Sequence, residues 1–384
     1  MKFFRSLFIL SGIVCLSVSC KKNEALHQLN DLFEYKAIAE DTTIRLVGTT
    51  GNRIFPTQNP FISSSNYNAY GFATILAMDS SRLLMAVSRY VKLTDWGSAD
   101  IVMKESADNG KNWGEEVVIQ KNVGVIQTVA PTLIKLTDSK LGLFFLVKHS
   151  SKSCDVYMKT SEDKGKVWTE PVKINKIEGY NTMNNDRILK IGNRLLVPIA
   201  YTSDVSKYMG KMGVFCYISD DLGKNWSVSS TLGANVPLME PGIVRIGNTS
   251  ELLMVMRSTA GKIVISRSYD MGSNWTAPVL TNLVSPESPS TICAVKNSQK
   301  LVLIWNNYSP PSGKPSYTNR CPLTVAFSND KGRTWEGSYN VEWIKNADYA
   351  YPVFFQNNNK TYLIYNVAGH GTQTIFTKML DIGE

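Results

Sequence analysis

The octet SADNGKNW at residues 106–113 returns four times further along the chain. The shared pattern is Ser-x-Asp-x-Gly-x-x-Trp, and the other copies are SEDKGKVW (161–168), SDDLGKNW (219–226), SYDMGSNW (268–275) and SNDKGRTW (328–335). The Asp residues stand at 108, 163, 221, 270 and 330, which gives spacings of 55, 58, 49 and 60 residues. Periods of this size indicate a repeat architecture in which each repeat is one small structural unit.

The residues around each octet alternate between apolar and polar side chains. DIVMKES (100–106) and KIVISRS (262–268) come directly before an octet, and EEVVI (115–119) follows one. Alternation of period two with β-branched residues predicts half-buried strands. The octet between them is therefore predicted to be a hairpin turn. We expect its Asp to bind the turn's own amides, its Gly to supply a positive φ, and its Trp to pack between neighbouring units.

Six further apolar runs lie between the octets and predict a second set of strands. They are RLLMAVSRY (82–90), KLGLFFLVK (140–148), NRLLVPIAY (193–201), ELLMVMRS (251–258), KLVLIWNN (300–307) and TYLIYNVA (361–368). Four strands in about 55 residues are typical of a β-propeller blade. The sequence thus predicts an all-β, six-bladed β-propeller over residues 42–384, with five octet hairpins at the outer edges of the blades. The sixth blade lacks an octet and is expected to be closed by N- and C-terminal strands.

The composition excludes several classes of partner. The chain has 41 Lys and Arg against 32 Asp and Glu, but no basic run, so no nucleic-acid partner is expected. Three His residues are too few for a multi-His metal site, no nucleotide motif is present, and no cofactor is expected. Cys154, Cys216, Cys293 and Cys321 form no Cys-x-x-Cys pair and are interpreted as buried free thiols. We expect a monomer.

The N-terminal residues have the layout of an export signal. Lys2 and Arg5 precede an apolar run over 7–18 that is too short to span a bilayer comfortably. The segment LSVSC (16–20) resembles a bacterial lipobox, with Cys20 as the residue that is lipidated. We therefore expect a signal peptide over 1–20, a tether over 21–41, and an exported, membrane-anchored lipoprotein at the periplasmic face or cell surface. A plain secreted protein is the alternative.

Ligands of propellers usually meet one axial end of the central channel, so polar residues at the ends of the apolar runs are candidates. Arg89 and Arg257 end such runs, Arg320 opens the strand before the last octet, Arg187 lies in the loop NTMNNDR, and Arg53 lies in NRIFP. One Arg at such a place is an ordinary solvated strand end. Several Arg on one axis are costly without an anion, and guanidinium groups bind carboxylates with two hydrogen bonds. The pattern favours a carboxylate-bearing ligand.

The five octets resemble the Asp-boxes of the bacterial sialidase superfamily, and the resemblance covers roughly residues 45–380. In that family a Glu precedes a strand that ends in Arg, as Glu240 and Arg257 do in LMEPGIVRIGNTSELLMVMRS. The family also has an Arg before the strand of the last Asp-box, which Arg320 matches, and an Arg-Ile-Pro motif, to which Arg53 in RIFP is similar with an extra Phe. The resemblance implies that Arg53, Arg257 and Arg320 clamp the carboxylate of sialic acid at the end of a glycan.

The resemblance also implies the catalytic residues of a retaining exo-sialidase. Tyr351 in ADYAYPVFF would be the nucleophile, with Tyr349 as the near alternative, and Glu240 would be its base. Asp95 in the loop KLTDWGS would protonate the leaving oxygen and then activate water. A neutral phenol suits this reaction because a carboxylate nucleophile would be repelled by the substrate's own carboxylate.

Two departures from the family leave other functions open. Asn366 stands where the family often has a carboxylate that steadies the first Arg, and the MNNDR segment is similar to that of a less characterised subgroup. The alternatives are a polysaccharide lyase, with His149 as its base, a uronic-acid or rhamnosyl glycosidase, and a non-catalytic glycan-binding lipoprotein.

Overall fold

In the computed structural model the described residues are 32–383, except 63, 93, 208–210, 312–318, 346, 359 and 370–374. Within these ranges the chain forms strands and loops with one 3₁₀ turn, η1 (Val205–Lys207), and no α-helix. No helix in this part of the chain could cross a membrane. The prediction of an all-β chain is confirmed here, whereas the signal peptide and Cys20 lie outside the described residues.

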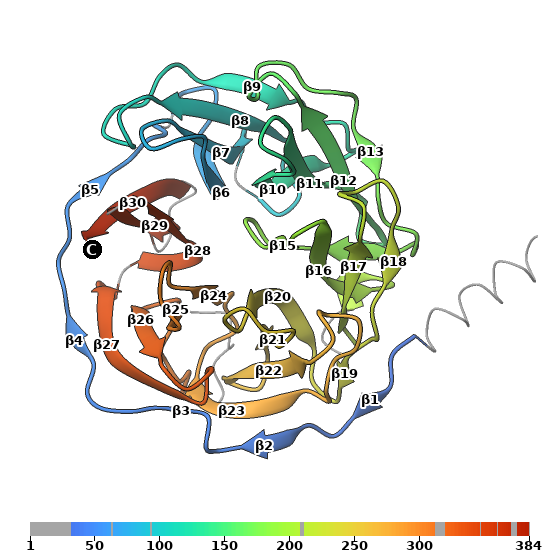
Figure 1. Ribbon diagram of the computed structural model, residues 1–384, viewed down its shortest axis with the longest axis vertical. Coiled ribbons are helices and arrows are strands. Elements are labelled where there is room, and N and C mark those ends of the chain that lie inside the picture. Colours follow the sequence, from blue (N-terminus) through green and yellow to red (C-terminus); the bar gives the residue numbers. More distant parts are fainter. Residues whose placement is uncertain are drawn as a thin grey trace, which may run out of the picture.

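The strands fall into successive antiparallel units that surround a common centre, with an early strand of each unit nearest that centre (Figure 1). The first unit is β6 (Ala69–Ala77), β7 (Leu83–Tyr90), β8 (Ala99–Ser106) and β9 (Val117–Gln120). The second is β10 (Gln127–Lys135), β11 (Leu141–Ser150), β12 (Ser153–Ser161) and β13 (Val172–Lys173). The third is β14 (Tyr180–Thr182), β15 (Leu189–Ile191), β16 (Arg194–Thr202), β17 (Gly213–Ser219) and β18 (Ser227–Val228).

Three more units complete the ring in Figure 1. The fourth is β20 (Leu238–Arg245), β21 (Leu252–Ser258), β22 (Lys262–Ser268) and β23 (Val279–Val284). The fifth is β24 (Thr291–Ala294), β25 (Leu301–Asn306), β26 (Leu323–Ser328) and β27 (Thr334–Glu342). The sixth is β28 (Ala347–Asn357), β29 (Lys360–Gly369) and β30 (Ile375–Gly383). A β12–β14 bridge joins the second and third units into one sheet. Because these two units are not separate sheets, the six-bladed propeller stays a prediction.

Each octet is the turn between the last two strands of its unit, at the outer edge of the ring. In the first copy the Ser106 hydroxyl donates to the Asp108 carboxylate at 2.9 Å and accepts from the Gly110 amide at 2.8 Å. The same carboxylate accepts from the amide of Asn112 at 2.8 Å, and Gly110 has a φ of 83°. The other four copies repeat the Ser–Asp and Ser–Gly bonds. The predicted turn chemistry is confirmed.

The octet Trp residues join neighbouring units, as predicted. Trp226 of the third unit meets Phe144 of the second edge to face, with ring centroids 6.2 Å apart. Trp335 of the fifth unit is buried in a cluster that includes Leu253 and Val255 of the fourth. The octets therefore stabilise the ring by burying apolar surface between units.

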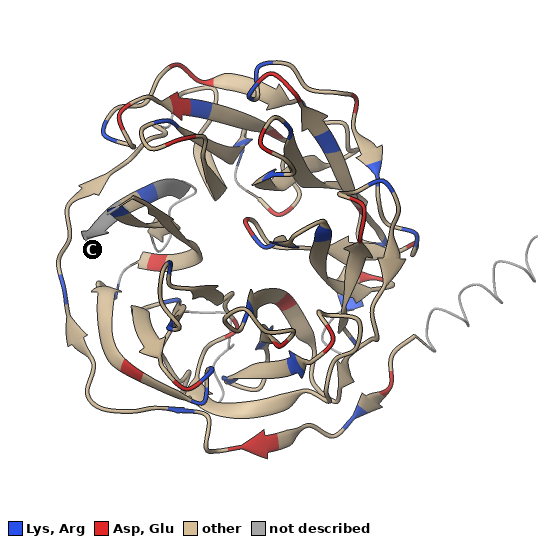
Figure 2. Cartoon of the chain, in the orientation of Figure 1, with Lys and Arg blue, Asp and Glu red and all other residues tan. Residues whose placement is uncertain are grey.

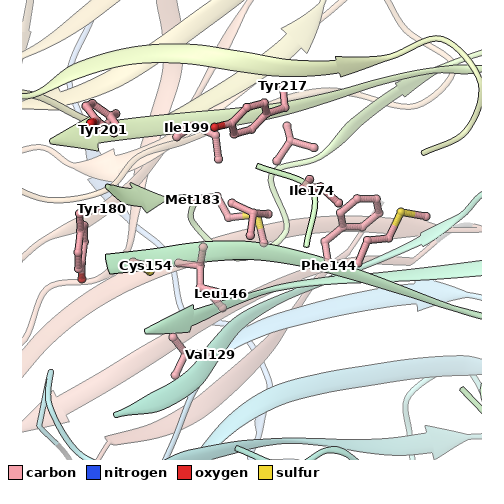
Figure 3. Close-up of a cluster of buried hydrophobic side chains, with 14 of the residues drawn as sticks. Val129, Phe144, Leu146, Cys154, Ile174, Tyr180, Met183, Ile199, Tyr201 and Tyr217 are labelled. Carbon is pink, nitrogen blue, oxygen red and sulfur yellow. The ribbon is translucent and has the colours of Figure 1, made fainter. Parts of the chain in front are cut away.

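Apolar clusters fill the spaces between adjacent units. Figure 3 shows one of them, in which Phe144, Leu146 and Cys154 of the second unit face Ile199 and Tyr217 of the third. Among the described residues Cys154, Cys216, Cys293 and Cys321 are all free thiols, and all but the partly exposed Cys293 are buried. The prediction of buried free thiols in strands is confirmed for Cys154 and Cys216, whereas Cys321 is buried just before β26 and Cys293 in β24 is only partly buried.

The segment before the first unit wraps around the outside of the ring (Figure 1). It contains β1 (Tyr35–Lys36), β2 (Ala39–Asp41), β3 (Arg45–Leu46), β4 (Gly51–Asn52) and β5 (Thr57–Gln58). β1 pairs with β19 (Gly233–Ala234), β2 with β23, both β3 and β4 with β27, and β5 with β30. The N-terminal β5 thus joins the C-terminal β30, as predicted for the sixth unit. The predicted end of the tether at residue 41 is wrong, because β1 and β2 already belong to the folded body.

Charged residues of both signs are interspersed around the ring (Figure 2). Many of them lie in loops and at strand ends, and the Lys and Arg residues do not gather on one side in this view. This distribution agrees with a chain whose basic residues are scattered along the sequence.

Candidate active site

Four of the innermost strands carry a β-bulge at which a residue other than Gly has a positive φ. The residues are Phe72 (φ 57°), Ala130 (57°), Glu240 (43°) and Tyr351 (57°), and the strand register shifts around each of them. Asp186 (φ 55°) occupies a similar place between β14 and β15. Such backbone is costly for these residue types, and a bulge re-aims the side chain out of the strand's alternation. Two of the five residues, Glu240 and Tyr351, are predicted catalytic residues.

The bulges bring four predicted site residues together. Arg257 at the end of β21 donates from Nη1 to Oε2 of Glu240 at 2.7 Å. The guanidinium carbon of Arg320 lies 5.8 Å from the ring centroid of Tyr351. Burial, and next the charge of Glu240, raise the pKa of Tyr351 to about 12, while Arg320 and Arg257 act against this rise. Tyr351 is therefore a protonated phenol at neutral pH with a carboxylate and two guanidinium groups around it.

Glu287 is a member of this cluster that the sequence did not reveal. Its side chain is 1 % exposed and accepts a hydrogen bond from Nη2 of Arg257 at 2.9 Å. Burial disfavours the charge of Arg257, but Glu240, Tyr351 and Glu287 outweigh burial and raise its pKa. In the sequence, Glu287 stands in SPESPST, a segment typical of a surface loop, so no local pattern marks it as a buried partner.

Asp95 lies at the mouth of this cluster, in the exposed loop between β7 and β8. Its charge contributes to the raised pKa of Tyr351. Its backbone carbonyl accepts from Lys148 Nζ at 2.7 Å and from Gln127 Nε2 at 3.1 Å, and the same ammonium lies 3.8 Å from the ring of Trp96. Lys148 thus holds the Asp95 loop near the cluster, a role that its place at a strand end did not suggest.

Tyr349 has different surroundings from Tyr351. It is 3 % exposed and belongs to an apolar cluster, where its ring meets that of Tyr365 edge to face at 6.1 Å. Of the two candidate nucleophiles, Tyr351 is the one beside Glu240, Arg257 and Arg320, whereas Tyr349 has Glu342 as its charged neighbour.

The structure does not bring Arg53 and Arg89 into this cluster, so their predicted role in substrate binding gains no support from it. Arg53 directly follows β4 on the outer rim and stacks on Tyr339 of β27, with its guanidinium carbon 4.3 Å from the ring centroid. Arg89 is nearly buried and bonded to Glu116 at 2.6 Å and to Asp100 at 3.1 Å. A guanidinium paired with two carboxylates has no charge left for a ligand.

Arg187 connects strands below the cluster. It is 6 % exposed, and its Nη2 donates to the carbonyl of Ser290 at 3.0 Å. Next to it, the Asp186 carboxylate accepts from the Thr74 hydroxyl at 2.6 Å, so the loop ties the first, third and fifth units together. Arg187 is a structural tie in this geometry, and its charge also interacts with that of Glu240. Its predicted role in substrate binding stays a prediction.

Two other residues from the alternative hypotheses have structural partners. Asn366 accepts the amide of Phe72 at the first bulge, at 3.1 Å, and does not steady Arg53. His149 accepts the amide of Val125 at 3.4 Å and is not among the groups that shift the pKa of Tyr351. Within the described ranges no group of three or more His, Cys, Asp or Glu residues could hold a metal ion.

The family of the chain follows from comparison with known proteins. A family model described as "BNR repeat-like domain" matches residues 84–364, well over half of the 384 residues. The chain belongs to the BNR repeat-like family. A search of curated proteins found no match.

Solved structures similar to this BNR repeat-like protein include sialidases. The NanB sialidase of Streptococcus pneumoniae is 14 % identical with a TM-score of 0.65, over 85 % of this chain and 71 % of that one. The intramolecular trans-sialidase of Ruminococcus gnavus is 14 % identical with a TM-score of 0.64, over 83 % and 95 %. A Dyadobacter fermentans protein of unknown function is 16 % identical with a TM-score of 0.67, over 85 % and 99 %. The predicted resemblance to the sialidase superfamily is confirmed at the level of the fold, which is all that a likeness at this identity shows.

Proposed function

We propose that this protein is an exo-acting, retaining glycoside hydrolase that uses Tyr351 as nucleophile and releases a terminal acidic sugar. The observation that carries the proposal is the convergence of Glu240, Arg257 and Arg320 on the phenol of Tyr351. Sialic acid is the first sugar to test, because similar folds occur in NanB and in a trans-sialidase.

In the first step Tyr351 Oη would attack the anomeric carbon while its proton passes to Glu240. The raised pKa of Tyr351, about 12, means that the phenol needs a base at neutral pH, and Glu240 is the carboxylate that acts most strongly on it. Asp95 would donate a proton to the departing glycosidic oxygen. The anomeric carbon–oxygen bond breaks and a Tyr351–sugar bond forms.

In the second step a water would attack the same carbon and restore the phenol. Asp95, now a carboxylate, would take the proton of this water, and Glu240 would return its proton to Tyr351. Two displacements at one carbon give retention of configuration. The exposed position of Asp95 suits a residue that meets first the leaving group and then water.

We also propose that the six strand units are the blades of one propeller whose axis passes through this site. The arrangement of the innermost strands around a common centre supports this interpretation (Figure 1). Export and lipidation at Cys20 remain part of the proposal and rest on the N-terminal sequence. Sialylated or other acidic glycans outside the cytoplasm would be the substrates.

The test is hydrolysis of 4-methylumbelliferyl glycosides by the purified full-length protein. The sialoside, the glucuronide and the rhamnoside are compared in parallel, and Arg320→Ala is the key variant. We expect release from an acidic glycoside that Arg320→Ala lowers by about 100-fold or more, since charge-assisted contacts of this kind are strong. Hydrolysis of the rhamnoside alone, unaffected by Arg320→Ala, would exclude the acidic substrate class. Absence of hydrolysis with all three glycosides would contradict the proposed enzymatic activity.

A further inference from the structure

Arg257 is held from two sides by carboxylates. Its Nη1 lies 2.7 Å from Glu240 and its Nη2 lies 2.9 Å from Glu287. All three side chains are largely withdrawn from solvent, with exposed fractions of 12 %, 16 % and 1 % in the order Arg257, Glu240 and Glu287. One guanidinium group and two carboxylates carry a net charge of −1, so this trio by itself does not attract an anion. The charge of Arg187 also acts on Glu240, but Arg187 is buried and donates to the carbonyl of Ser290.

Arg320 differs from Arg257 in its charge environment. Its backbone amide donates to Asp348 at 2.8 Å, but no ion pair of its guanidinium is found in the described part of the chain. The guanidinium is half-buried and faces the ring of Tyr351 at 5.8 Å. A cation in this position, without a carboxylate partner of its own, is available to a ligand.

We propose that Glu287 is a positioning residue that neutralises Arg257 and fixes Glu240 beside Tyr351, so that Arg320 alone binds the acidic group of the sugar. Glu287 precedes β24 and Arg257 ends β21, so the ion pair also joins two neighbouring units. Glu240 sits at a strained φ of 43°, and its carboxylate accepts a hydrogen bond from Arg257. The direction in which Glu240 points therefore depends on the two bonds that Arg257 makes. This inference rests on the proposed function.

The experiment removes the charge of Glu287 and keeps its shape. Glu287→Gln retains an oxygen acceptor for Arg257 and leaves Arg257 with one carboxylate instead of two. Calorimetry on the full-length protein measures the affinity for N-acetylneuraminic acid and glucuronic acid, and for the methyl ester of each. We expect the variant to bind one of the free acids about tenfold more tightly than the wild type, with the ester unchanged, because a negative charge near the ligand is lost. With a cleaved glycoside as substrate, kcat is expected to fall while KM also falls.

Two control variants separate charge from general damage. Glu251 at the opposite end of β21 forms a comparable pair with Arg267 at 2.9 Å, and Glu251→Gln is expected to change neither affinity nor kcat. Glu287→Asp keeps the charge with a shorter reach, so we expect wild-type acid affinity with a reduced kcat. Arg320→Ala is expected to abolish the preference for acid over ester.

Several outcomes would overturn the proposal. The first is that Glu287→Gln leaves the affinity for the free acid unchanged. The second is that Glu287→Gln weakens the binding of acid and ester equally. The third is that Arg320→Ala still binds the acid more tightly than the ester. If Glu287→Gln has a melting temperature well below that of the wild type, the proposal is judged on the acid preference of Arg320→Ala alone. A changed acid affinity in a protein that cleaves no glycoside would reject the proposed hydrolase and leave this charge assignment intact.

Discussion

Tyr349 and Tyr351 are two residues apart on β28, and in a regular strand their side chains would share a face. The register shift between Ala350 and Val353, with a φ of 57° at Tyr351, breaks that alternation. Tyr349 then packs in the apolar cluster and Tyr351 faces Glu240 and Arg257. One bulge thus separates a core tyrosine from the proposed nucleophile.

Removal of each phenol hydroxyl should separate the two roles. We expect Tyr351→Phe to lower kcat/KM by about 1000-fold or more on the cleaved glycoside, with little change in melting temperature. We expect Tyr349→Phe to keep kcat/KM within about threefold, and to cost roughly 1 kcal/mol of unfolding free energy because a buried hydroxyl is lost. Steady-state kinetics and denaturant unfolding measure the two effects. Full activity in Tyr351→Phe would contradict the assigned nucleophile.

Asp186 should make stability depend on pH in an unusual direction. Burial raises its pKa to about 6, above an ordinary unfolded value of about 4, although Thr74 and Arg187 act against the rise. The folded state then binds more protons than the unfolded state between about pH 4 and 6, so stability falls as pH rises through this window. We expect Asp186→Asn, which keeps an acceptor for Thr74 and tolerates the positive φ, to melt higher than the wild type at pH 7 and to match it near pH 4. Equal melting temperatures at both pH values would contradict this view of Asp186.

At the scale of the element, each octet hairpin is a small turn that also fits against its neighbour. Gly332 has a φ of 82°, and a Cβ atom at this position would lie 2.5 Å from Cδ2 of Leu253 in the adjacent unit. The Gly is therefore required both by the backbone conformation and by close packing.

An alanine at each of two Gly residues should distinguish these requirements. Gly192 also has a positive φ, 60°, but a Cβ there would meet nothing within 4 Å. We expect Gly192→Ala to lower the unfolding free energy by about 1 kcal/mol from backbone strain alone, and Gly332→Ala to lower it by about 2–3 kcal/mol because strain and overpacking add. Urea unfolding of both variants measures the difference, and equal losses would show that the contact with Leu253 is unimportant.

At the scale of the whole molecule, the segment from β1 to β5 acts as a belt on the outside of the ring. It pairs with β19 and with outer strands of the fourth to sixth units, and its last strand joins the chain's C-terminal strand. Phe33 anchors its beginning: it is 5 % exposed and packs directly on Gly213, where a Cβ would lie only 2.2 Å from its ring.

Removal of the Phe33 ring should loosen the start of this belt. We expect Phe33→Ala to cost about 3 kcal/mol and to speed tryptic cleavage at Lys36, because an aromatic side chain leaves a cavity and the short strand β1 loses its anchor. Val47→Ala is the matched control: Val47 lies on the same belt, is 43 % exposed, and should change neither property. Equal cleavage rates in Phe33→Ala and the wild type would contradict the anchoring role.

The sequence alone determined the all-β class, the octet turns and the superfamily, because these depend on local chemistry. A Ser, Asp and Gly within five residues specify a turn wherever they occur, and alternation of apolar residues specifies a strand. Arg257 and Arg320 could be named in advance because they stand at the ends of predicted strands, and Glu240 and Tyr351 because the resemblance to the sialidase superfamily implied them.

Only the tertiary structure decided which charged residues meet. Arg53 and Arg89 have sequence contexts similar to those of Arg257 and Arg320, but Arg53 lies on the outer belt and Arg89 is neutralised by Glu116 and Asp100. Glu287 is 30 residues from Arg257 along the chain, and no local pattern predicts their contact. The physical reason is that bulges and ion pairs between units depend on how separate sheets pack around one centre, whereas turns and strands depend on neighbours in the sequence.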